Sequence, residues 1–370
     1  MLVARKKKKT KISITYPERN FSYYYFYFHC NNDFKGVRKK TNANSCAHEI
    51  KTKIQCKMPR YTEIVLNKCL GLKNNENFLI VTDSKLKDIA EIFYDEAKKI
   101  TNNVKLIEIP IPKVHGTEPS KDVAEEMLNY DAELLITTKS LSHTNARINA
   151  CKKGARIVTM PGITKEILER TIDIDYNKLM KIHKKLGDII DKGKEVKITT
   201  RLGTNLTFSI EGRKAFGRDS GLFIKKGGFG NLPTGEIFVA PVEGTANGIY
   251  LVDASFAGIG KLESQIKVYV KNGHAVKIEG FNAKKLERLL DSSGKEARNI
   301  AEFGIGTNEK AKITGNILED EKVIGTCHIA LGNNIGFGGK TSVQLHLDGI
   351  IKNPAIFVDK NKIIDEGRFF

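Results

Sequence analysis

Short apolar runs alternate with helical patterns over residues 58–165. Residues 78–82 form a run of Phe, Leu, Ile, Val and Thr, as expected of a strand buried on both faces of a parallel sheet. Residues 86–100 then carry the spacing of an amphipathic helix. Further strand patterns lie at 104–111, 132–137 and 155–159, with a helix expected over 145–153. Strands that alternate with helices over short loops predict an α/β N-terminal domain with a parallel sheet.

The pattern changes in the second half of the chain. A long amphipathic helical pattern covers residues 166–192, and we expect a linking helix within 166–194. From residue 195 helical signals become sparse, while glycine and β-branched residues increase. Strand patterns occur at 196–200, 205–210 and 267–270, and helix patterns at 283–290 and 295–300. Residues 195–370 are therefore predicted to form an α+β domain that carries the metal-binding site proposed below.

Residues 1–57 show no persistent helical or strand period. A run of lysines at 6–9 precedes an aromatic run at 23–28 and then a polar stretch. Met58 opens the regular pattern. We therefore expect residues 1–57 to be a disordered or wrongly assigned extension, with Met58 as the natural start. The alternative is a genuine basic arm.

The net charge of +18 suggests nucleic-acid binding until its distribution is considered. Residues 1–57 hold 14 Lys and Arg against 3 Asp and Glu, and the rest of the chain holds 47 against 40. A remainder so nearly balanced predicts solvated surface and no nucleic-acid partner. No run approaches the ~18 apolar residues of a membrane span, and no signal peptide is visible. We therefore expect a cytoplasmic protein with no membrane partner.

Two patterns that suggest other chemistry fail on closer reading. Residues 334–341 nearly spell a phosphate-binding loop, but Asn334 replaces its first glycine. That loop also needs a helix directly after its Lys-Thr pair, whereas the residues after Thr341 alternate like a strand. The six cysteines show no C-x-x-C spacing, which argues against a disulfide framework or a zinc ribbon.

The sharpest chemical signal is His346-Leu347-Asp348 on a predicted strand. Residues i and i+2 of a strand point to the same face, so the imidazole and the carboxylate should emerge together. Such a pair can bind one metal ion or bridge two. A hydrogen-bonded His–Asp pair without metal is the alternative interpretation.

Three other segments add metal-binding side chains to this pair. His328 lies on a probable strand, Glu236 directly after a turn, and Glu302 directly before a glycine-rich loop. Carboxylates beside tight turns and apolar strands are costly unless they are paired or ligated. Each glutamate taken singly is expected at the surface. Together the five residues predict a metal site.

These segments resemble the aminopeptidase T family of metallo-aminopeptidases, from about Met58 to the C-terminus. The motifs that carry the resemblance are N-L-P-T-G-E-I-F-V-A-P at 231–241, E-F-G-I-G-T-N at 302–308, G-T-C-H-I-A-L-G at 325–332 and H-L-D at 346–348. The resemblance implies two divalent ions per chain, zinc or cobalt, held by Glu236, Glu302, His328, His346 and Asp348. It also implies a homodimer and a peptide substrate.

The expected activity is that of a hydrolase, an aminopeptidase that removes N-terminal residues from peptides through a metal-activated water. Glu236 or Glu302, if not a ligand, would act as the catalytic proton shuttle. The family has a Tyr seven residues after its first His, and that position is Ile335 here. The alternative is therefore a mononuclear non-heme iron dioxygenase of the dihydroxypyridine type, with Fe(II) on His328, His346 and Asp348. A metal-storing or structural domain is a third interpretation.

The remaining histidines have less support. His143 follows a parallel strand, where ligand sites of α/β proteins lie, so it either closes the pocket from the first domain or is a surface residue. His115, His183 and His274 are expected at the surface because no partner pattern surrounds them.

Overall fold

The computed structural model describes residues 59–370. The expectations about residues 1–57 and about Met58 as the natural start lie outside this range. Helices begin with α2 (Arg60–Glu63), a π-helix η1 (Ile64–Cys69), α3 (Lys87–Ala97), α4 (Lys121–Glu126), a 3-10 turn η2 (Met127–Asn129), α5 (Asn145–Lys153) and α6 (Lys165–Thr171). Each predicted element between residues 78 and 159 has a counterpart within a few residues of its expected bounds.

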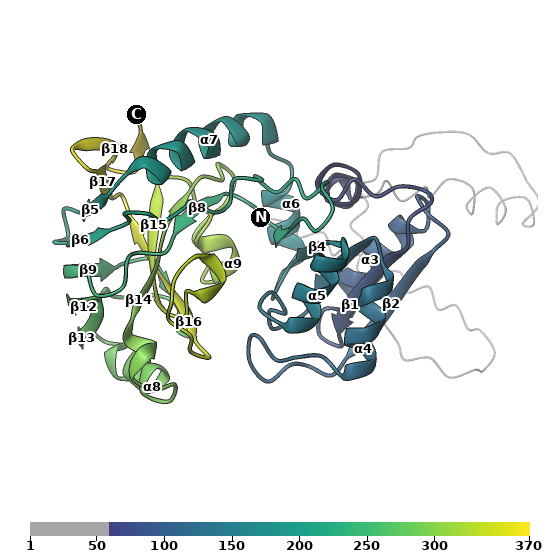
Figure 1. Cartoon of the computed structure of the whole chain (residues 1–370), viewed down its shortest axis with the longest axis horizontal. Coiled ribbons are helices and arrows are strands. Elements are labelled where there is room, and N and C mark those ends of the chain that lie inside the picture. The colour runs from purple at the N-terminus through teal and green to yellow at the C-terminus, as the bar shows by residue number, and fades with distance from the viewer. Residues whose placement is uncertain (1–58) are drawn as a thin grey trace, which may run out of the picture. The chain divides into compact units, whose positions relative to one another are not determined.

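The first sheet is five-stranded and entirely parallel, in the order β2-β1-β3-β4-β7. Its strands are β1 (Phe78–Asp83), β2 (Val104–Ile109), β3 (Ala132–Ile136), β4 (Arg156–Thr159) and β7 (Phe229–Asn231). Alternate residues of β1 enter two cores, one shared with α3 and one with α5 (Figure 1). Helices on both faces explain why β1 is apolar throughout. The prediction of an α/β domain with a parallel sheet is confirmed.

Strand β7 comes from far along the chain and adds to the edge of this sheet beside β4. The segment that contains it lies beyond residue 195. The division of the chain at residues 165 and 195 remains a prediction, and it does not include this return of the chain.

The long helical pattern over 166–192 forms two helices, α6 and α7 (Tyr176–Lys192), instead of one. The side chain of Asp175 accepts hydrogen bonds from the backbone N–H groups of Asn177 and Lys178. An aspartate in this position satisfies the free donors at a helix N-terminus, so it starts a new helix.

The remaining strands form two antiparallel sheets. The eight-stranded sheet has the order β13-β12-β9-β6-β5-β17-β18-β19, and the six-stranded sheet the order β11-β10-β16-β15-β14-β8. The strands of the first are β5 (Glu195–Thr199), β6 (Asn205–Ser209), β9 (Asn247–Val252), β12 (Ile266–Lys271), β13 (His274–Glu279), β17 (Ala355–Val358), β18 (Asn361–Asp365) and β19 (Arg368–Phe369). Those of the second are β8 (Glu236–Val239), β10 (Ser255–Phe256), β11 (Gly260–Lys261), β14 (Ile300–Gly306), β15 (Thr326–Gly332) and β16 (His346–Lys352).

Both antiparallel sheets contribute to one hydrophobic core, which α7 and α8 (Ala283–Asp291) also enter. The remaining short elements are the turn η3 (Lys295–Arg298), α9 (Ile317–Asp320) and the turn η4 (Ile335–Phe337). No helix follows Thr341, in agreement with the rejection of a phosphate-binding loop. The predicted α+β architecture of this half is confirmed. Within residues 59–370, none of the helices combines the length and the hydropathy needed to cross a bilayer.

The six-stranded sheet has one apolar face and one polar face. Phe303 and Ile305 of β14 and Ile329 of β15 enter the core, and Leu347 of β16 packs against it. Because side chains alternate along a strand, the residues between them project to the opposite face. That face carries the five residues predicted to bind metal.

Candidate metal centre

Four adjacent strands supply the five predicted residues. Glu236 begins β8, Glu302 lies in β14, His328 in β15, and His346 and Asp348 in β16. Ala330 stands between Glu302 and Asp348 in the pairing register, so a small side chain separates the two carboxylates. Glu236 and Asp348 are 112 positions apart in the sequence, but antiparallel pairing of the strands brings all five residues to one face of the sheet.

Glu302 occupies the middle of this cluster. One carboxylate oxygen lies 3.2 Å from His328 Nε2, and the other lies 3.4 Å from His346 Nε2. His346 Nε2 is also 3.4 Å from Asp348 Oδ1, and His328 Nε2 is 3.5 Å from Glu236 Oε2. A single carboxylate thus connects both imidazoles.

The separations suit ligands of a common ion. Atoms about 2.0–2.2 Å from one metal ion lie about 3–3.5 Å apart at tetrahedral or octahedral angles. Two groups of donor atoms fall within 4.8 Å of one another: Glu236, Glu302 and His328, and Glu302, His346 and Asp348. Glu236 Oε2 and Asp348 Oδ1 are buried without a hydrogen-bond partner. Buried acceptors of this kind fit a metal ion, so a metal cofactor is consistent with the side chains present.

The set His328, His346 and Asp348, expected for an iron centre, is not itself one of these two groups. His328 belongs to one group and the His346–Asp348 pair to the other. Glu302 is the carboxylate that both groups share.

A hydrogen bond to the backbone orients the imidazole of His346. Its Nδ1 lies 2.8 Å from the backbone carbonyl of Asn333. A carbonyl can only accept, so Nδ1–H donates and the lone pair of Nε2 points towards Glu302 and Asp348. Metal-binding histidines are commonly held in this way.

A glycine makes room for the other imidazole. Gly304 pairs with His328 across β14 and β15. A Cβ atom at Gly304 would stand 2.0 Å from His328 Nε2, well inside van der Waals contact. The absence of a side chain at Gly304 therefore leaves space for the ring beside β14.

The electrostatics favour a cation at this position. Loss of hydration lowers the pKa of His328, but its hydrogen bond to Glu302 and the charge of Glu236 outweigh this and raise the pKa to about 9. Loss of hydration raises the pKa of Asp348, but the charge of the neighbouring His346 brings it down to about 2. The same imidazoles hold the pKa of Glu302 below its ordinary value despite burial. These shifts favour a positive charge beside the carboxylates, and a metal ion would supply that charge in place of protons on the imidazoles.

Two charged residues that the sequence did not single out complete the cluster. Lys322 is buried and its Nζ lies 2.8 Å from Glu236 Oε1, and it also contacts the Glu321 carboxylate. Burial raises the pKa of Glu321 to about 8 against the opposing charge of Lys322. Both residues follow α9 in an irregular turn. In the sequence they belong to a run of charged residues, and such a run ordinarily indicates solvent-exposed surface. No spacing rule could have identified them.

Aromatic rings form an apolar wall beside His346. The ring of Phe337 meets His346 edge-on, with 5.8 Å between centroids. Phe238 packs against Phe337 at 5.5 Å, and Phe216 stacks on Phe238 at 5.7 Å. Phe337 lies in η4, two residues after Ile335, which is exposed. The aromatic neighbour of the site is thus Phe337 and not the residue at the position of the family tyrosine.

The other histidines divide between site and core. A Cβ atom at Gly336 would lie 3.6 Å from His143 Nδ1, and the charges of His346 and Glu302 act on His143. His143 is exposed, which leaves it accessible beside the cluster.

The expectation that His183 lies at the surface is wrong: its ring is fully buried and contacts Gly217, Ser220 and Thr307. Amphipathic spacing in α7 places it on the inward face.

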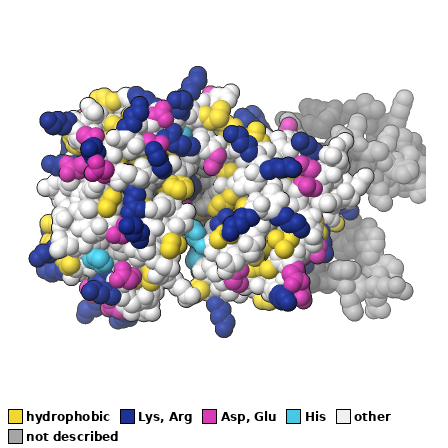
Figure 2. All heavy atoms as spheres, in the orientation of Figure 1, with side chains coloured by type: hydrophobic (Ala, Val, Ile, Leu, Met, Phe, Trp, Pro, Cys, Tyr) yellow, Lys and Arg dark blue, Asp and Glu magenta, His cyan; other side chains and the backbone are white. Residues whose placement is uncertain are grey.

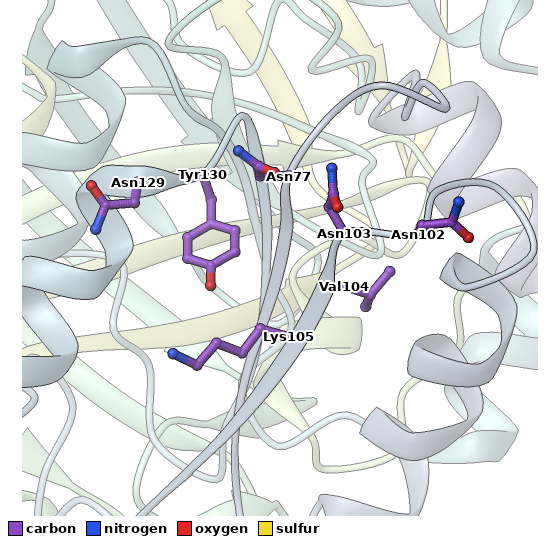
Figure 3. Close-up of a pocket in the computed structure, with 7 residues that line it drawn as sticks. All are labelled: Asn77, Asn102, Asn103, Val104, Lys105, Asn129 and Tyr130. Carbon is purple, nitrogen blue, oxygen red and sulfur yellow. The ribbon is translucent and has the colours of Figure 1, made fainter.

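A cavity of about 380 Å³ lies elsewhere, at the start of β2. Figure 3 shows its lining residues: Asn77, Asn102, Asn103, Val104, Lys105, Asn129 and Tyr130. None of the five predicted residues takes part. Lys105, its charged member, is paired with Glu126 at 2.6 Å. On the face shown in Figure 2, Lys and Arg side chains are scattered among Asp and Glu.

Comparison with known proteins identifies a matching family and a related enzyme. The family model described as 2,5-dihydroxypyridine 5,6-dioxygenase matches residues 57–370. The 2,5-dihydroxypyridine 5,6-dioxygenase of Pseudomonas putida is 22% identical over 255 residues, which cover 64% of this chain and 70% of that protein.

Two solved structures share the fold. A 2,5-dihydroxypyridine dioxygenase from Pseudomonas putida superposes with a TM-score of 0.73 at 17% identity, covering 85% of this chain and 97% of that one. The aminopeptidase AmpT from Thermus thermophilus superposes with a TM-score of 0.63 at 15% identity, covering 84% and 98%. The aminopeptidase T resemblance therefore holds for the fold.

The predicted activity is wrong. The sequence motifs favoured a hydrolase, a metallo-aminopeptidase, but the family model over residues 57–370 and the Pseudomonas relative both indicate a dioxygenase, which is an oxidoreductase. The motifs misled because they contain candidate metal-binding residues, and one fold can carry such residues for different activities. The structure and the comparisons give no support to zinc or cobalt as the metal.

Proposed function

The chain belongs to the 2,5-dihydroxypyridine 5,6-dioxygenase family, and from that premise we propose that it is a metal-dependent, ring-opening dioxygenase of a dihydroxylated aromatic compound. The observation that carries the proposal is the position of Glu302, whose two oxygens face His328 and His346. Two imidazoles and an adjacent carboxylate are the donor set of non-heme iron(II) oxygenases. We therefore propose iron(II) as the metal, with Asp348 as a further carboxylate ligand.

Iron(II) in such a set would let dioxygen react with an aromatic ring. The side chains of this protein have separate tasks. The Asn333 carbonyl holds the Nδ1 proton of His346 and so keeps Nε2 free for the metal. The lack of a side chain at Gly304 leaves room for the His328 ring, and buried Glu302 offers one oxygen to each imidazole.

The aromatic wall supports a planar substrate. Phe337 is almost completely buried, while Phe238 is half-buried on the same sheet face as Glu236. Aromatic side chains pack well against flat rings and exclude water from one side of them. We propose that the substrate ring lies against Phe337 and Phe238, with its hydroxyl groups directed to the metal.

The name of the related enzymes specifies the bond. A 5,6-dioxygenase of 2,5-dihydroxypyridine places both atoms of one dioxygen molecule across the bond between ring positions 5 and 6. That bond breaks, both oxygen atoms remain in the product, and no external reductant is needed. We propose the same balance for this chain with 2,5-dihydroxypyridine or a closely similar ring.

Oxygen consumption tests the proposal. The full chain is freed of metal, loaded with iron(II) without oxygen, and its iron content is measured. With 2,5-dihydroxypyridine we expect one dioxygen consumed per ring lost, and two labelled atoms in the product from ¹⁸O₂. His346→Ala should bind little iron and consume no oxygen. Iron-loaded protein that leaves a panel of dihydroxylated pyridines and benzenes intact would refute the proposal.

A further inference from the structure

A buried lysine lies against the metal centre. The side chain of Lys322 is 1% exposed, and its two carboxylate partners, Glu236 and Glu321, are 15% and 12% exposed. With so little water nearby, the ammonium group needs a carboxylate close by to balance its charge, and Glu236 supplies one. A lysine in this environment is rare unless it is paired.

The backbone fixes the place of this ammonium group. The Lys322 carbonyl accepts a hydrogen bond from Asn308 N–H at 2.8 Å, and its N–H donates to the Glu319 carbonyl at 2.9 Å. Asn308 follows β14, the strand that carries Glu302. The lysine is therefore tied to the same sheet as the metal-binding side chains.

The two donor groups of the centre differ in how they relate to Lys322. Both include Glu302, so the cluster has the form of a centre for two ions. Within residues 59–370, Lys322 forms ion pairs with Glu236 and Glu321 but none with His346 or Asp348, although its charge helps to lower the pKa of Asp348. The group of Glu236 and His328 is in direct contact with the lysine, because Glu236 gives Oε1 to Lys322 and turns Oε2 towards His328.

We propose that Lys322 acts as a built-in cation that restricts this centre to a single metal ion. Its ammonium group balances Glu236, the carboxylate that would otherwise support a second ion. It would also stand close to that ion and repel it in a poorly hydrated site. This inference rests on the proposed function in one respect: it takes the same cluster of side chains to be the metal centre.

Metal stoichiometry tests this role without substrate or iron. The metal-free full chain is titrated with cobalt(II), separated from free metal, and analysed for bound cobalt per chain, while the cobalt absorption bands report the number of sites. We expect one ion in the natural protein and two in Lys322→Met. Lys178→Met removes an exposed lysine paired with Glu309 and should still give one.

Two results would overturn the proposal: two ions in the natural protein, or one ion in folded Lys322→Met. If circular dichroism shows that Lys322→Met is unfolded, Lys322→Gln is measured instead, since it removes the charge but keeps a donor for Glu236, and one ion there is equally contrary. A single ion without oxygen uptake would refute the proposed function alone. Two ions with ring opening would refute this inference alone.

Discussion

Gly304 lies directly opposite His328 in the pairing of β14 and β15, and the imidazole occupies the space where a side chain at Gly304 would stand. The proposed metal centre therefore depends on a residue that has no functional group. A backbone position controls the placement of a ligand by leaving room for it.

Gly304→Ala tests this dependence. The new methyl group would overlap His328 Nε2 at 2.0 Å, so the ring must move away from Glu302. We expect the affinity for one metal ion to fall at least about tenfold, as for other losses of ligand orientation. Isothermal titration with cobalt(II) measures the change.

Gly336→Ala is the control, because its methyl group meets nothing closer than 3.6 Å. It should bind metal like the natural protein. Equal affinities of Gly304→Ala and the natural protein would contradict the steric explanation.

Phe337→Ala should weaken substrate binding more than it slows the reaction. The ring of Phe337 is 7% exposed and meets His346 edge-on, so its loss removes apolar contact from the substrate side. We expect KM for 2,5-dihydroxypyridine to rise roughly tenfold, which corresponds to about 1.4 kcal/mol. Steady-state oxygen uptake provides KM and kcat. Phe281→Ala changes a ring that is 81% exposed and should leave both constants unaltered; an unchanged KM in Phe337→Ala would argue against an aromatic wall.

Arg170→Met should destabilise the fold. Arg170 of α6 donates two hydrogen bonds to the fully buried carboxylate of Glu319, at 2.7 and 2.6 Å. Removing the arginine leaves a buried charge without its partner, which costs about 3 kcal/mol. Urea denaturation followed by circular dichroism measures the loss. In Lys184→Met, an exposed i,i+4 pair with Asp188 is broken instead, and we expect a loss below about 0.5 kcal/mol. Similar stabilities of the two variants would refute this account.

The stability of the metal-free protein should fall between about pH 6.5 and pH 4 through His183. Burial lowers the pKa of His183 from 6.5 to about 4, although the Gly217 carbonyl opposes the shift. Below pH 6.5 the unfolded chain takes up a proton that the folded ring does not, so acid favours unfolding. The full effect is of the order of 3 kcal/mol.

Urea denaturation at pH 7.5, 5.5 and 4.5 measures this effect. His183→Gln keeps polar contacts to Gly217 and Thr307 but cannot titrate, so its stability should depend less on pH over this range. Carboxylates contribute equally to both proteins. Parallel pH profiles would show that His183 does not titrate as described.

The sequence by itself determined the local architecture. Apolar runs of five or six residues predicted β1 and β3, and the spacing over 145–153 matched α5, because burial on both faces of a sheet or on one face of a helix leaves a periodic record. The H-x-D pattern correctly placed His346 and Asp348 on one strand face. The helical spacing over residues 166–192 was misleading, because it continues across Asp175, whose side chain caps the start of α7 and separates this helix from α6.

Only the tertiary structure decided how the five candidate metal-binding residues are arranged. Glu302 lies between two imidazoles because β14 pairs with β15 and β15 with β16, and no spacing in the sequence records that order. Burial of Lys322 and His183 depends on segments packed over them from distant parts of the chain. Long-range pairing sets distances, charge balance and access to water together, whereas local periodicity reports only which side of an element faces inward.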